Sequence, residues 1–101
     1  MKIPESVKIG DIIYKVSKVN RINADPELNG QIRYSMGEIL LLDASAFPED
    51  YKFNSFLHEL IHGIRYHMQM AVEDEDEEEK IVKQFTNGLA MVLADNPDLF
   101  K

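Results

Sequence analysis

The feature that most constrains this chain is the pentapeptide at residues 58–62, in which two histidines stand four residues apart and a glutamate follows the first. On an α-helix, residues i and i+4 lie about 40° apart around the axis, so His58 and His62 can reach the same metal ion. Glu59 would then project beside the metal, where the general base of a zinc hydrolase takes a proton from bound water. The pentapeptide therefore supplies two ligands and a base, but no third ligand.

The residues around the pentapeptide favour a helix with one buried side. Uncharged side chains stand at Phe56, Leu57, Leu60, Ile61 and Ile64. Histidines on a partly buried helix need polar partners, because an unpaired buried imidazole is costly. A metal ion would satisfy both rings. The alternative is a structural protein with incidental histidines, which predicts no stoichiometric metal.

Length and composition indicate one small domain over residues 1–101. The chain is 45% hydrophobic and 29% charged, which suits a single core. The absence of cysteine leaves nitrogen and oxygen atoms as the available metal ligands, and this favours a catalytic over a structural metal site. The longest apolar run, residues 89–94, is too short for a membrane span, and the amino terminus does not resemble a signal peptide. We therefore expect a cytoplasmic protein that binds no membrane.

The net charge of −7 argues against direct binding of nucleic acid, which depends on basic side chains, and favours basic partners. Much of the excess lies in seven consecutive acids, Glu73 to Glu79. We interpret this run as a solvated connection that becomes the first turn of a helix, where negative charge suits the helix dipole.

The pattern of apolar residues predicts an α+β fold. Residues 1–11 read as an irregular lead, residues 12–19 as a strand, and residues 30–35 and 38–42 as a hairpin. Residues 21–29 read as a loop and residues 43–48 as the crossing into the histidine helix. That helix should run from residue 49 or 50 to Met70, and a second helix from Asp76 to Ala94, closed by Asn96-Pro97.

The second helix should pack one apolar side against the first helix. Its apolar residues fall within a third of the circumference and are Ile81, Val82, Phe85, Leu89, Val92 and Leu93. The same projection places Glu78 near the centre of this side and Glu79 at its edge. A carboxylate that faces a core needs a strong partner, which a metal held by two histidines would provide.

Together these features resemble the small ImmA/IrrE-type zinc metallopeptidases of bacteria, prophages and mobile elements. The resemblance covers about residues 10 to 97. It rests on five features in order along the chain: the strand at residues 12–19, a Gly-Xaa-Ile-Xaa-Tyr hairpin, the segment Leu57-His58-Glu59-Leu60-Ile61-His62-Gly63, an acidic helix start and Asp95-Asn96-Pro97. It implies a minimal zincin fold, a small antiparallel or mixed sheet packed on the histidine helix with a second helix after it. It also implies that His58 and His62 bind Zn²⁺ and that Glu59 is the catalytic base.

The resemblance also bears on the third ligand. In this family the ligand glutamate typically stands three residues before a small or β-branched apolar residue, and Val82 then selects Glu79. The helical projection prefers Glu78, so Glu78 remains the alternative to Glu79. The family often has an acidic residue or Asn four positions after the ligand, which supports a liganding histidine. Here that position is Lys83, and the departure puts this support in doubt.

Three further features are weighed less strongly. His67 is a candidate ligand or transition-state donor, and Tyr66 is a candidate donor to an oxyanion. His67, however, points to another side of the helix, and both are more simply explained as surface or packing residues. The strand at residues 38–42 belongs to a hairpin of which one strand could bind a substrate peptide by β-augmentation. Otherwise it is a plain core strand.

The leading functional hypothesis is a zinc metallopeptidase that cleaves a specific protein. The family is associated with cleavage of DNA-binding repressors, which are basic and would be attracted to a domain of charge −7. The alternative is a catalytically degenerate metal-binding module that regulates a protein partner, which Lys83 and the small size of the chain favour.

Overall fold

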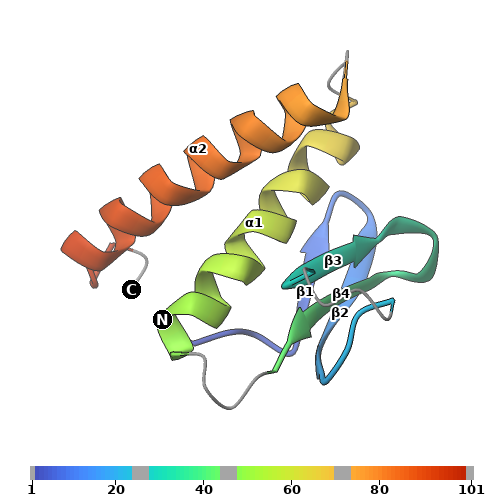
Figure 1. Ribbon diagram of the computed structural model, residues 1–101, viewed down its shortest axis with the longest axis horizontal. Helices are drawn as coiled ribbons and strands as arrows, with labels where there is room; N and C mark the ends of the chain where they lie inside the picture. Colours follow the sequence, from blue (N-terminus) through green and yellow to red (C-terminus); the bar gives the residue numbers. More distant parts are fainter. Residues whose placement is uncertain (1, 24–27, 44–47, 70–73, 100–101) are drawn as a thin grey trace.

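The computed structural model describes residues 2–23, 28–43, 48–69 and 74–99. These residues form the strands β1 (Ser6–Ile9), β2 (Ile12–Val19), β3 (Gly30–Arg33) and β4 (Glu38–Leu42), followed by the helices α1 (Glu49–His67) and α2 (Glu75–Asp95). The sheet order is β1-β2-β4-β3, with β2 and β4 parallel and the other pairs antiparallel. Helix α1 lies between the sheet and α2 (Figure 1). The predicted α+β fold, a small mixed sheet with two helices, is confirmed.

The first strand corrects the prediction of an irregular lead over residues 1–11. Val7 and Ile9 alternate with polar residues, and Ile9 pairs directly with Ile12 across a two-residue turn. Gly10 lies in that turn at a φ of 61°, a conformation that glycine adopts without steric cost. Because the strand has only four residues, its alternation was too short to separate it from a loop.

The second hairpin is confirmed, with a different boundary. Strand β3 ends at Arg33 rather than Ser35, because Tyr34–Met36 forms a short 3₁₀ turn. Gly37 closes this turn at a φ of 62°. Tyr34 is partly buried and packs against residues of the sheet and against Tyr66 of α1.

Strand β4 lies inside the sheet, between β2 and β3. Its residues Ile39, Leu40 and Leu41 are all buried. Residues 38–42 therefore form a plain core strand and cannot pair with a peptide. The edge strand of this hairpin is β3, and within the described residues no strand pairs with its outer side.

Helix α1 covers one face of the sheet. A core cluster forms between them and consists of Ile9, Tyr14, Ile39, Leu41 and Phe56. At Gly63 the approach is close, since a Cβ atom there would lie 2.8 Å from Ile9 Cδ1 and 2.9 Å from Ile32 Cδ1. The helix ends at His67 rather than Met70. Gln69 has a φ of 55°, which ends the helix, and Met70 lies outside the described residues.

Helix α2 begins within the acidic run, as predicted. The Asp74 side chain caps it by accepting a hydrogen bond from the Glu77 backbone N–H at 2.7 Å, and Glu75 to Glu78 occupy the first turn. These acids face the positive end of the helix dipole. Glu73, the first acid of the run, lies outside the described residues. Neither described helix has the length and apolar character needed to cross a membrane.

The predicted apolar side of α2 is only partly correct. Val82 and Leu93 are buried, whereas Phe85 is 66% exposed and Val92 is 42% exposed. Among the described elements, α2 packs mainly on α1, on the side away from the sheet (Figure 1). It therefore buries a narrower stripe than a helix that lies in a groove between several elements. The stripe includes Thr86, whose hydroxyl donates to the Val82 carbonyl oxygen at 2.7 Å and is thereby satisfied.

Candidate metal and catalytic site

Helix α1 places His58 and His62 on one face, one turn apart. Their ring centroids are 4.9 Å apart, and the two Nε2 atoms are separated by 3.2 Å. Both rings are half-buried beneath α2. Two imidazoles thus direct the same nitrogen atom toward one point, as the spacing of the pentapeptide requires.

Helix α2 brings the Glu79 carboxylate to the same point. Its Oε1 lies 2.5 Å from His58 Nε2 and its Oε2 lies 3.1 Å from His62 Nε2. One ligand atom from each of the three residues falls within 4.8 Å of the others, so this group could hold a metal ion. The structure therefore brings together the two histidines and the glutamate that the resemblance selects.

Burial keeps the His58 ring in the neutral form that a metal ligand needs. The pKa of His58 is lowered, first by burial and then by the neighbouring His62 and Lys83, while Glu79 opposes the shift. A neutral imidazole carries a lone pair on one ring nitrogen, which metal coordination requires.

The alternative ligand, Glu78, lies on the other side of His62. Its Oε1 is 3.5 Å from His62 Nδ1, and Arg65 Nε donates to its Oε2 at 2.8 Å. The Glu78 side chain is only 12% exposed, as its central place on the helical projection predicted. A carboxylate beside Nδ1 favours the tautomer that carries the proton there and leaves Nε2 free to bind metal. Glu78 is therefore positioned to support His62, the role that was expected of position 83.

Glu59 projects from α1 toward the edge strand β3. It is 8% exposed, and a Cβ atom at Gly30 would lie 3.1 Å from its Oε2, so only glycine fits there without displacement. Burial, reinforced by the negative charge of Glu79, raises the pKa of Glu59 to about 7, while a hydrogen bond with the Ile32 backbone acts in the opposite direction. A carboxylate of this pKa can both accept and return a proton near neutral pH.

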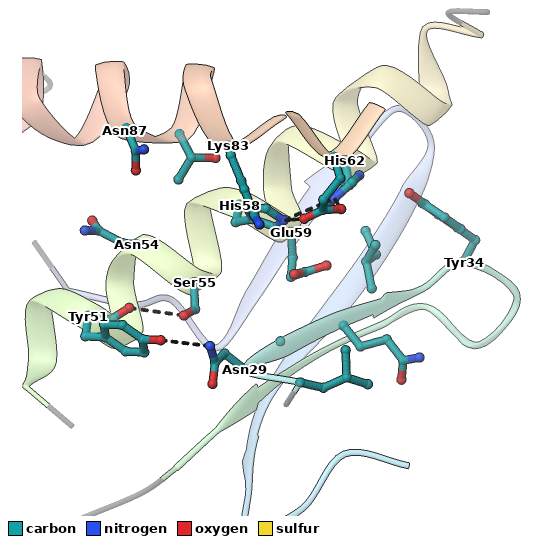
Figure 2. A pocket seen from close by; sticks show the side chains of 16 residues that line it. Asn29, Tyr34, Tyr51, Asn54, Ser55, His58, Glu59, His62, Lys83 and Asn87 are labelled. Atoms are coloured by element: carbon teal, nitrogen blue, oxygen red, sulfur yellow. Dashed lines mark hydrogen bonds and ion pairs between the residues drawn. The ribbon is translucent and has the colours of Figure 1, made fainter. Parts of the chain in front are cut away.

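An open cleft of about 710 Å³ runs past these residues between β3, α1 and α2. The group of His58, Glu59, His62 and Glu79 lines one part of it. Neutral polar side chains line much of the remainder and include Asn29, Tyr51, Asn54, Ser55 and Asn87 (Figure 2). Asn29 donates to the Tyr51 hydroxyl at 2.8 Å, which joins the loop before β3 to α1.

The two weaker candidates on α1 lie away from the metal group. His67 is half-buried rather than on the surface, and its Nε2 forms a 2.7 Å hydrogen bond with the Tyr14 hydroxyl. Tyr66 is 51% exposed, and its ring stacks on Tyr34 with centroids 3.8 Å apart. Both positions serve packing in this structure.

Sequence reasoning missed three residues that shape the site. Tyr34 lines the cleft, and its pKa is raised to about 12 by burial and by the nearby charge of Glu59. Arg65 anchors Glu78, and Gly30 leaves space for Glu59. Tyr34 and Gly30 both belong to the Gly-Xaa-Ile-Xaa-Tyr segment that was noted only as supporting the resemblance. The position of Arg65, three residues after His62 on the same side of the helix, was the available signal for its role.

Comparison of the chain with protein-family models, with curated proteins and with solved structures finds no match. The function is therefore inferred from the geometry of the site itself.

Proposed function

We propose that this chain is a cytoplasmic zinc-dependent metallopeptidase of the ImmA/IrrE type that hydrolyses a peptide bond in a specific protein. The observation that carries the proposal is the meeting of His58, His62 and Glu79 beside a buried Glu59. Two imidazole nitrogen ligands, one carboxylate and an adjacent acid together form the donor set of zinc hydrolases with a glutamate ligand.

Two of the three distances between ligand atoms fit such an ion, while the distance between His58 Nε2 and Glu79 Oε1, 2.5 Å, is shorter. Ligand atoms at about 2.0–2.1 Å from a tetrahedral metal are separated by ~3.3 Å from one another. The two Nε2 atoms are 3.2 Å apart, and Glu79 Oε2 is 3.1 Å from His62 Nε2. With no cysteine in the chain, the donor set excludes thiolate sites and agrees with Zn²⁺.

When bound, Zn²⁺ acts as a Lewis acid that lowers the pKa of water and polarises a carbonyl group. Glu59 accepts the proton of the attacking water and returns it to the leaving amine, for which its raised pKa is suited. His58, His62 and Glu79 hold the ion, and Glu78 orients His62. The free side of β3 aligns an extended substrate, because Gly30 to Ile32 line the cleft beside Glu59.

We propose that the substrate is a basic DNA-binding repressor. The net charge of −7 would attract such a protein by complementary potentials, and the encounter should weaken as salt rises. An open cleft would accept an exposed segment of the repressor, with selectivity supplied by docking of the whole protein rather than by a deep pocket.

Zinc content tests the proposal. Elemental analysis after zinc dialysis should give one Zn²⁺ per chain for the wild type and for Glu59→Gln, and none for His58→Ala or His62→Ala, because ligands set occupancy and the base sets rate. His67→Ala, which removes a histidine outside the group, should retain its zinc. Wild-type protein without zinc would contradict the proposal. Cleavage is tested by incubating the zinc-loaded protein with a DNA-binding repressor encoded beside it and mapping the fragments by mass spectrometry. Zinc binding without such cleavage would favour a regulatory module over a protease.

A further inference from the structure

The Lys83 side chain extends from α2 over the cleft. Lys83 stands one turn after Glu79, and its ammonium group reaches toward His58 (Figure 2). Its positive charge is close enough to contribute to the lowered pKa of His58. This placement differs from the supporting role expected of position 83, which Glu78 occupies instead.

The ammonium group of Lys83 lacks an acidic partner among the described residues. No carboxylate oxygen there lies within 4.0 Å of it. Glu79 would be its natural partner at the i, i+4 spacing, but both Glu79 oxygens are turned toward the two histidines. The cation is therefore available to a molecule in the cleft.

The surroundings of Lys83 suit a negatively charged group. Asn87 stands one helical turn further along α2, and Asn54 and Ser55 project into the same cleft from α1, so neutral hydrogen-bonding side chains line the cleft together with Lys83 (Figure 2). The carboxyl and amino side chains that line the cleft are those of Glu59, Glu79 and Lys83, with charges of −1, −1 and +1 when all three are ionised. A bound divalent ion leaves this set with one surplus positive charge, within a protein whose overall charge is −7.

We infer that Lys83 forms a subsite for a carboxylate of the substrate, next to the bond that is cleaved. This inference rests on the proposed metallopeptidase function and adds the chemistry of the substrate at one position. The carboxylate is supplied either by an Asp or Glu side chain or by the carboxyl terminus of the peptide. Attraction of a basic protein to the whole surface and recognition of one acidic group in the cleft act at different ranges and are compatible.

Two matched hydroxamates test the subsite without a known substrate, because a hydroxamate binds zinc directly. Succinic acid monohydroxamate carries a carboxylate, and butyrohydroxamic acid has the same chain length without one. Calorimetric titration of the zinc-loaded wild type should show about fivefold tighter binding of the acidic compound, the effect typical of a partly exposed ion pair. Lys83→Gln should remove this preference. Lys80→Gln is the control, since Lys80 lies on α2 but does not line the cleft.

A charge-reversing variant separates recognition from catalysis. Lys83→Glu should bind 4-aminobutyrohydroxamic acid more tightly than succinic acid monohydroxamate, while its affinity for butyrohydroxamic acid stays near the wild-type value. If Lys83 instead stabilises the polarised carbonyl, Lys83→Gln would weaken all three compounds equally, and the inference would be overturned. Binding of butyrohydroxamic acid with no preference for the acidic compound would also overturn it, while the proposed function would stand. Failure of all hydroxamates to bind would overturn the proposed function and the inference together.

Peptides distinguish the two sources of the carboxylate. Zinc-loaded Glu59→Gln, which should bind substrate without cleaving it, is titrated with one neutral peptide in three forms: amidated at its carboxyl terminus, free at its carboxyl terminus, and amidated with one internal Glu. Tighter binding of the free form identifies the carboxyl terminus, and tighter binding of the Glu form identifies an acidic side chain. Equal binding of all three forms overturns the subsite.

Discussion

The buried carboxylate of Glu59 should make the metal-free protein less stable as pH rises. Its pKa is about 7 in the folded protein and 4.5 when the group is solvated. Between these values the folded chain binds more protons than the unfolded chain, so the free energy of unfolding falls as pH increases. The loss is complete above pH 7 and amounts to about 3 kcal/mol for a shift of this size.

Replacing Glu59 with glutamine removes this dependence, because the amide is never charged. Metal-free Glu59→Gln should therefore be more stable than the wild type by about 2–3 kcal/mol at pH 8 and about equally stable at pH 4.5. Urea denaturation of both proteins with a chelator at the two pH values measures the difference. Contributions from the rest of the chain largely cancel, because the two proteins differ only at residue 59.

Glu5→Gln is the matched control, because the Glu5 side chain is exposed and its replacement should leave the difference near zero at both pH values. Zinc should reduce the advantage of Glu59→Gln, because the ion offsets the negative charge that burial penalises. A stability difference between Glu59→Gln and the wild type that is the same at pH 4.5 and pH 8 would refute the argument that burial controls this carboxylate.

Three further sets of substitutions have measurable outcomes, two at the site and one elsewhere on α2. Glu79→Gln should weaken zinc binding by orders of magnitude because it removes a ligand, whereas Glu78→Gln should weaken it about tenfold because it removes only a support of His62. Competition titrations with a chromogenic chelator measure both affinities. The reverse ranking would show that Glu78 is the ligand. Gly30→Ala should lower peptidase activity without changing zinc content, because its Cβ would lie 3.1 Å from the Glu59 Oε2 atom, and unchanged activity would contradict the close fit. Gly88→Ala, where a Cβ meets nothing within 4 Å, should instead stabilise the protein by about 0.5–1 kcal/mol in urea denaturation.

The positions of the two acids on α2 show how far sequence reasoning reaches. Helical projection selected Glu78 because it lies at the centre of the buried side, and the family pattern selected Glu79. The structure places the two carboxylates on opposite sides of the His62 ring, so each argument detected a real feature. Helical periodicity predicts which side chains face inward. It does not predict which ring nitrogen of His62 the Glu78 and Glu79 carboxylates contact.

Other features needed information from outside their own segment. The exposure of Phe85 depends on how narrow a surface α1 offers to α2, which the pattern within α2 does not contain. Similarly, the interior place of β4 depends on the parallel pairing of β2 with β4, a contact between distant segments. The direction of Lys83 depends on Glu79 being turned toward the histidines, so it could not be predicted before the site was assembled.

Helix α2 has few buried contacts with the rest of the molecule, so a metal ion bound between α1 and α2 would affect how long the protein survives in a cell. Only Val82, Thr86 and Leu93 are buried along α2, and Glu78 and Glu79 make its polar contacts with α1. An ion bound by residues of both helices would therefore hold α2 against α1, and its binding energy would oppose local opening of α2. Under zinc starvation α2 would open more often and expose its backbone to cellular proteases. The amount of this protein in a cell would then report the zinc available to it.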